Sequence, residues 1–138
     1  MVYINKDTFE IYENLIGCED ELNNYFECDE FIAYTIKLLN IKGYKTNYCC
    51  AGHIYPEKQR YKGNEALVYF NTYISFEDVY NFETIPNGFY LSRDKKSLHA
   101  DFEDVNFSED RKEQILEALE NLYLWASLLL PIKNRGDK

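Results

Sequence analysis

The clearest pattern of hydrophobic and polar positions lies near the C-terminal end of the chain. Apolar residues recur there every three or four positions, at Ile115, Leu119, Leu122 and Ala126. This spacing is typical of an amphipathic helix with one buried face. Ser108 is a favourable N-cap, and Glu109 and Asp110 suit the positive end of the helix dipole. Pro131 cannot continue a helix, so we predict a helix from about 108 to 130.

A second helix is predicted between Asp29 and about Asn40. Asp29 can cap its first turn, and a broad apolar face follows at Phe31, Ile32, Thr35, Ile36, Leu38 and Leu39. Gly43 lies just past the end, where a left-handed C-cap favours a residue without a Cβ. Residues 7–28 also carry apolar residues at helical spacing, interrupted by Gly17. We interpret this stretch as an irregular helical opening of the chain.

Between the helices, alternation with a period of two predicts strands. In a strand over 44–50 one face is formed by Tyr44, Thr46 and Tyr48. A second strand covers about 66–76, with one face formed by Val68, Phe70, Thr72, Ile74 and Phe76. A hairpin follows over 89–103, with its turn at 94–96. In its last strand Leu98, Ala100 and Phe102 face one way, and the opposite face is formed by His99, Asp101 and Glu103.

This order of elements is typical of an α+β fold, an antiparallel-rich sheet packed by two main helices. A length of 138 residues suits one domain. We therefore expect a single α+β domain over 1–138, with a frayed tail at about 132–138.

The net charge of the chain limits the kinds of molecule that it is expected to bind. The formal net charge is −9, from 24 acidic and 15 basic residues. Proteins that hold nucleic acid neutralise phosphates with clustered Lys and Arg, so no broad nucleic-acid surface is expected. The sequence lacks an apolar run of membrane-spanning length and the pattern of a secretory signal at its N-terminus. We expect a cytoplasmic protein without membrane contact, whose four cysteines are thiols.

The segment 43–53 is the most informative local motif. A predicted strand ends there in Cys50-Ala51-Gly52-His53. Small residues let the backbone approach a bound group closely, and successive N–H groups of a turn can form an anion-binding nest. His53 adds an imidazole that is chargeable near neutral pH. Scarce arginines and a second histidine complete the predicted ligand site, which consists of Thr46, Tyr48, Cys50, Ala51, Gly52, His53, Arg60, Arg93 and His99.

The same segment resembles the N-terminal signature of the wybutosine-synthesis methyltransferase family, which acts on transfer RNA. That signature ends in Thr-x-Ser-Ser-Cys-Ser-Gly-Arg, and this chain matches it at Thr46, Cys50 and Gly52. It departs from it at Cys49, Ala51 and His53, the last replacing the arginine. The segment also resembles small "Cys-Cys-Ser-Gly-His" proteins of low-GC bacteria and their phages. The first resemblance implies a relative that uses S-adenosylmethionine to modify transfer RNA.

Several interpretations of these residues remain open. The Cys49-Cys50 pair can be buried packing, and Gly52 can serve a turn only. A zinc site is disfavoured because adjacent strand cysteines point to opposite faces. A nucleophilic Cys49 or Cys50 activated by His53 or His99 is a further alternative.

The sequence favours a non-enzymatic binder of a small, anionic, nucleotide-like ligand, with no metal and no cofactor. One concrete version is a phage-type sponge that sequesters a nucleotide immune signal. The alternatives are the methyltransferase relative and a homo-oligomeric interaction module, and a homo-oligomer is expected on account of the many aromatic residues.

Overall fold

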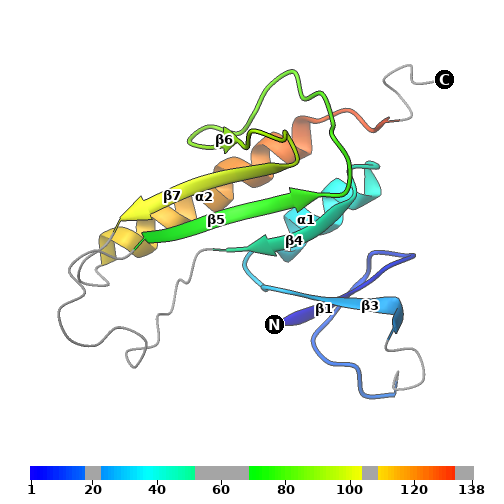
Figure 1. Cartoon of the computed structure of the whole chain (residues 1–138). Helices are drawn as coiled ribbons and strands as arrows, with labels where there is room; N and C mark the ends of the chain where they lie inside the picture. Colours follow the sequence, from blue (N-terminus) through cyan, green and yellow to red (C-terminus); the bar gives the residue numbers. More distant parts are fainter. Residues whose placement is uncertain (18–22, 52–68, 104–108, 133–138) are drawn as a thin grey trace.

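The structure, a computed structural model, describes residues 1–17, 23–51, 69–103 and 109–132 (Figure 1). The strands are β1 Val2–Asn5, β2 Ile11–Tyr12, β3 Tyr25–Cys28, β4 Thr46–Cys50, β5 Tyr69–Phe76, β6 Tyr90–Leu91 and β7 Ser97–Glu103. The helices are α1 Ala33–Ile41 and α2 Glu109–Leu128. All described strand pairs are antiparallel, and the predicted α+β class is confirmed. The strands form two sheets rather than one.

The larger sheet has four strands in the order β4-β5-β7-β6. Both helices pack against the same face of this sheet, α2 on β5 and β7 and α1 on β4 (Figure 1). The residues that point toward the helices are all buried: Thr72, Ile74, Phe76, Leu98 and Ala100. The predicted alternation of β5 and β7 is therefore confirmed where side chains are described. The opposite face of the sheet carries no helix in the described part of the chain.

Helix α2 supplies the other half of the main core. Its four predicted core residues, Ile115, Leu119, Leu122 and Ala126, are all buried. Trp125 and Ala118 are buried beside them, and the indole of Trp125 donates a hydrogen bond of 3.0 Å to the carbonyl of Thr84. The helix ends at Leu128, two residues earlier than predicted. The predicted N-cap Ser108 lies outside the described residues.

The N-terminal part of the chain differs from the prediction. The predicted irregular helix over 7–28 is wrong in the described parts, 7–17 and 23–28, since these contain β2 and β3. Both strands pair with β1 in a three-stranded sheet of order β2-β1-β3. A side-chain turn at Asn5 accounts for this difference. The Asn5 carboxamide oxygen accepts hydrogen bonds from the backbone N–H groups of Asp7 (2.7 Å) and Thr8 (2.8 Å). Such a side-chain turn competes with helix formation and reverses the chain.

The helix predicted from Asp29 begins four residues later, at Ala33. Asp29 instead fixes the turn before it, accepting the backbone N–H of Phe31 at 2.9 Å. At the other end, Gly43 has a φ of +96°, as a left-handed C-cap requires. A Cβ built at Gly43 would also lie 3.2 Å from the Cβ of Ile132. The predicted role of this glycine is confirmed, with close packing as a second reason for it.

Strand β4 contains an irregularity that the alternation did not predict. Thr46 pairs with Phe76, whereas Tyr48 pairs with Ser75, so the register shifts between the two. Antiparallel partners share a face, and Phe76 faces the helices while Ser75 does not. Thr46 therefore lies on the helix side and Tyr48 on the open side. The prediction that both belong to one face is wrong because a bulge at Asn47 inserts an extra residue.

Candidate functional site

A cleft lies between the three-stranded sheet and the edge of the four-stranded sheet. Its volume is about 390 Å³, within the range of about 300–1,000 Å³ typical of small-ligand sites. We call it the inter-sheet cleft and define it by its lining residues: Lys6, Phe9, Phe26, Asn40, Lys45, Thr46, Asn47 and Glu77. Residues from the β1–β2 turn, β3, α1, β4 and the end of β5 meet there.

Asn40 and Thr46 form a prearranged polar wall in the inter-sheet cleft. The buried Asn40 side chain donates to the carbonyl of Ile36 (2.8 Å) and to the Thr46 hydroxyl (2.9 Å). Its carboxamide oxygen accepts the Thr46 backbone N–H at 3.2 Å. Because the Thr46 hydroxyl accepts from Asn40, its own proton is left to donate to another acceptor. The wall thus holds the oxygen of one hydroxyl group in place at the cleft.

The β1–β2 turn supplies the opposite wall, in an uncommon backbone conformation. Phe9 has a φ of +61°, a left-handed value that a bulky residue rarely adopts. Hydrogen bonds hold it there: Phe9 N–H donates to the carbonyl of Asn5, and Lys6 N–H to that of Asn24. Strained residues persist only where the surroundings hold them, and they cluster at ligand sites. Together with Phe26, Phe9 gives the inter-sheet cleft two aromatic rings.

Lys6, Lys45 and Glu77 carry the charge of the inter-sheet cleft. All three are exposed, and the two lysines against one glutamate leave a local excess of positive charge. The chain as a whole has a net charge of −9. This reversal of sign makes the cleft a favourable place for an anion.

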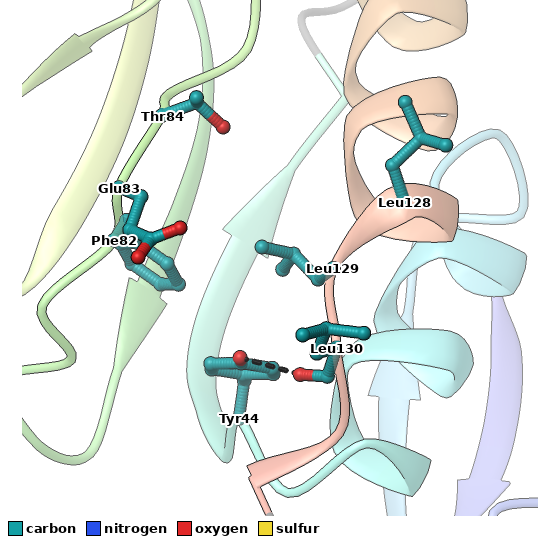
Figure 2. A pocket seen from close by; sticks show the side chains of 7 residues that line it. All are labelled: Tyr44, Phe82, Glu83, Thr84, Leu128, Leu129 and Leu130. Atoms are coloured by element: carbon teal, nitrogen blue, oxygen red, sulfur yellow. Dashed lines mark hydrogen bonds between the residues drawn. The ribbon is translucent and has the colours of Figure 1, made fainter. Parts of the chain in front are cut away.

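A second pocket, of about 250 Å³, lies at the end of α2, between the C-terminal residues of the helix and residues 82–84 (Figure 2). Tyr44 closes one side, its hydroxyl donating to the carbonyl of Leu130 at 2.7 Å. The charged side chain lining this pocket is Glu83. This pocket therefore disfavours anions.

A third pocket, of about 360 Å³, lies between α2 and the start of the hairpin, and it includes Gly88, Ala100 and Asn121. Asp101 and Glu117 are its charged lining residues. Two carboxylates repel an anion in the same way as Glu83 does. Of these three hollows, the inter-sheet cleft alone combines ring faces with positive charge.

The open face of the four-stranded sheet carries an aromatic row. Strand register aligns Cys50 with Tyr73, Tyr73 with His99 and His99 with Tyr90. The His99 ring is stacked between the two tyrosines, with centroids 5.7 Å from Tyr73 and 5.5 Å from Tyr90. The Tyr90 hydroxyl donates to Asp101 at 2.7 Å, and this bond raises the pKa of Tyr90. The row therefore consists of three rings, from β5, β7 and β6, that stack on one another across the open face.

The predicted site residues fall into separate places. Cys50, Tyr48 and His99 share the open face, whereas Thr46 lines the inter-sheet cleft. Ala51 is 1% exposed, and its carbonyl accepts the Thr72 hydroxyl at 2.8 Å. Arg93 is exposed in the hairpin turn. The predictions for Gly52, His53 and Arg60 lie outside the described residues, and with them most of the predicted nest.

Cys28, Cys49 and Cys50 are free cysteines, and the sulfur atoms of Cys28 and Cys49 lie 3.5 Å apart. No three potential metal ligands of the His, Cys, Asp and Glu type gather within the described ranges. Cys18 and His53 fall outside those ranges.

Of the residues that line the inter-sheet cleft, the sequence predicted only Thr46 as a ligand-site residue. The lining residues are scattered from Lys6 to Glu77, and each is unremarkable in its own segment. One usable signal existed: Asn5 followed by Asp7 and Thr8 is a turn composition, which would have placed Phe9 in a loop rather than a helix.

Comparisons with models of protein families, with curated proteins and with solved structures find no match for this chain. The resemblances noted on the 43–53 segment therefore stay predictions. Of the helices within the described ranges, none has both the length and the apolar character needed to cross a bilayer.

Proposed function

We propose that this protein binds a small anionic ligand of nucleotide type in the inter-sheet cleft. The supporting observation is the pairing of Lys6 and Lys45 with the rings of Phe9 and Phe26 in one hollow of about 390 Å³. An aromatic ring pair suits a planar base, and two ammonium groups suit a phosphate as point charges. The Thr46 hydroxyl, whose oxygen Asn40 holds in place, adds a hydrogen-bond donor. Sequestration of a nucleotide signal is the concrete version of this proposal.

The test is a thermal-shift series with adenosine monophosphate, adenosine and inorganic phosphate as probes. A ligand that binds only the folded state raises the melting temperature. At a ligand concentration of a hundred times Kd, it adds about 2.7 kcal/mol to the free energy of unfolding. We expect adenosine monophosphate to raise it most, since it alone offers both ring and charge. S-adenosylmethionine and transfer RNA are included, because a shift with either would favour the methyltransferase alternative instead.

Two matched double variants each remove two lysine charges, one in the inter-sheet cleft and one in the hairpin turn. Lys6→Gln/Lys45→Gln removes both lysines of the cleft, whereas Lys95→Gln/Lys96→Gln removes two exposed lysines of the hairpin turn. The first should abolish the shift and the second should leave it. The proposal fails if no nucleotide shifts the melting temperature, or if only the hairpin variant loses the effect.

A further inference from the structure

Two cysteines lie face to face where the two sheets meet. Cys28 ends β3 in the three-stranded sheet, and Cys49 belongs to β4 in the four-stranded sheet. Their sulfur atoms are 3.5 Å apart, within hydrogen-bonding distance for thiols. Cys28 is 1% exposed, whereas Cys49 is half-buried. Cys49 is therefore the more exposed residue of the pair, and Cys28 is the sheltered one.

The contact makes the two thiols chemically unequal. The hydrogen bond between the sulfurs lowers the pKa of Cys49, and the backbone N–H of Asp29 lowers it further, although burial opposes both. The same hydrogen bond and burial raise the pKa of Cys28. The more exposed thiol is thus the easier one to ionise, and a thiolate is the reactive form.

The neighbouring Cys50 provides an internal comparison. Successive residues of a strand point to opposite faces, and Cys50 pairs with Tyr73 on the open face while Cys49 pairs with Ile74 on the covered face. Cys49 and Cys50 therefore share a strand and a residue type, but only Cys49 has Cys28 within 3.5 Å.

We propose that Cys28 and Cys49 form a redox-responsive dithiol, which a peroxide converts into a disulfide joining β3 to β4. A disulfide requires a sulfur–sulfur distance of about 2.05 Å, so the two sulfurs must approach each other from their present contact. Disulfides of this kind in reducing compartments are transient and sense oxidants.

The chemistry balances in two steps. The Cys49 thiolate attacks one oxygen of hydrogen peroxide, the O–O bond breaks, and Cys49 becomes a sulfenic acid as hydroxide leaves. The Cys28 sulfur then attacks the Cys49 sulfur, an S–S bond forms and the S–O bond breaks. The leaving hydroxide takes the Cys28 proton and departs as water. Two electrons pass from the sulfur atoms to the peroxide, and a dithiol reductant reverses the change by exchange.

The disulfide would close a loop that contains α1 and fasten the small sheet to the large one. Constraining such a loop in the unfolded chain should raise the melting temperature by about 10 °C. Because β3 and β4 also line the inter-sheet cleft, the bond would fix the spacing of its walls. The dithiol proposal does not depend on any ligand, and its test uses none.

The test treats the whole chain, in a Cys18→Ser background, with a small excess of hydrogen peroxide. Intact mass and peptide mapping without reduction should show the loss of two hydrogen atoms and a bond between the peptides of Cys28 and Cys49. The melting temperature should rise and return to its starting value with dithiothreitol. Cys50→Ser should behave identically, which makes it the matched control.

Substitutions of each cysteine separate the roles of the two sulfurs. Cys28→Ser should stop at a Cys49 sulfenic acid that dimedone traps, and Cys28→Ala provides the same test if serine is not tolerated at this buried position. Cys49→Ser should form no disulfide. A bond from Cys50, or oxidation of Cys50 while both Cys28 and Cys49 remain open to alkylation, would overturn the proposal.

Discussion

Ile74 and Tyr73 are neighbours on β5, yet they stand on the two differently built faces of the four-stranded sheet. Ile74 is fully buried beneath the helices, together with Leu98 of β7. Tyr73 is half-buried on the open face, where His99 stacks on it. One face is held by removal of apolar surface from water, and the other by directional contacts between rings and polar groups.

The difference shows where the stability of this fold resides. Full burial of an aliphatic side chain contributes about 1.5–3 kcal/mol. A cross-strand pair on an exposed face contributes only about 0.2–1 kcal/mol. The covered face therefore determines whether the sheet forms, while the open face can vary without loss of the fold. Three substitutions test this division, and they are ordered by the size of the expected effect.

The largest effect is expected for Ile74→Ala on the covered face. Removing buried methyl and methylene groups and leaving a cavity should lower the free energy of unfolding by about 2–5 kcal/mol. Urea denaturation followed by circular dichroism measures it. Ser75→Ala, the next residue on the open face, is the control and should change stability by no more than about 0.5 kcal/mol. Equal losses from both variants would contradict the comparison.

A smaller effect is expected where the covered face carries a polar group. The buried Thr72 hydroxyl donates to the carbonyl of Ala51 at 2.8 Å. Thr72→Val keeps the shape but leaves that carbonyl without its donor, and should cost about 1–3 kcal/mol. Thr72→Ser retains the hydroxyl and should lose only about 0.8 kcal/mol for the missing methyl. If valine proves the more stable of the two, this bond has no net value.

The smallest effect is expected for Tyr90→Phe on the open face, which removes the hydrogen bond to Asp101 at an exposed site. We expect a loss of about 0.5 kcal/mol or less at neutral pH. The pKa of Tyr90 is raised above its ordinary value of 10.0 by that bond, by partial burial and by the negative charge of Asp101. Its contribution is therefore complete below pH 10 and is lost as the pH rises through the folded-state pKa. Denaturation of both proteins at pH 8 and above pH 10 should show the difference shrinking; a constant difference would exclude the linkage.

The sequence predicted the parts of the fold in which one periodic face meets one large partner. The stripe from Ile115 to Ala126 and the alternation from Thr72 to Phe76 are both of this kind. The three-stranded sheet was not predicted, because its pairing of Val2 with Cys28 is long-range and β2 has only two residues. Helical spacing in so short a stretch is easily produced by chance.

The candidate site was less predictable than the fold, for a geometric reason. Thr46 was expected at a ligand site, and it lines the inter-sheet cleft. Its partners in the cleft depend on the bulge at Asn47 and on the turn that places Phe9. Neither feature produces a regular spacing of apolar residues, so hydrophobic periodicity does not predict it. Neither Lys6 nor Lys45 stands out in its own segment, and only the folded chain brings both to the inter-sheet cleft.

The termination of α2 depends on a distant part of the chain. The Lys42 ammonium donates to three carbonyls at the end of the helix, those of Ala126 (2.9 Å), Ser127 (2.8 Å) and Leu129 (2.6 Å), and Lys42 is 84 positions before Ala126. The carbonyl of Lys42 also accepts the N–H of Ile132. Local sequence alone therefore does not fix where this helix stops. A peptide comprising residues 109–132 should fray at its last turn, and that turn should become ordered only when the N-terminal half of the chain is supplied.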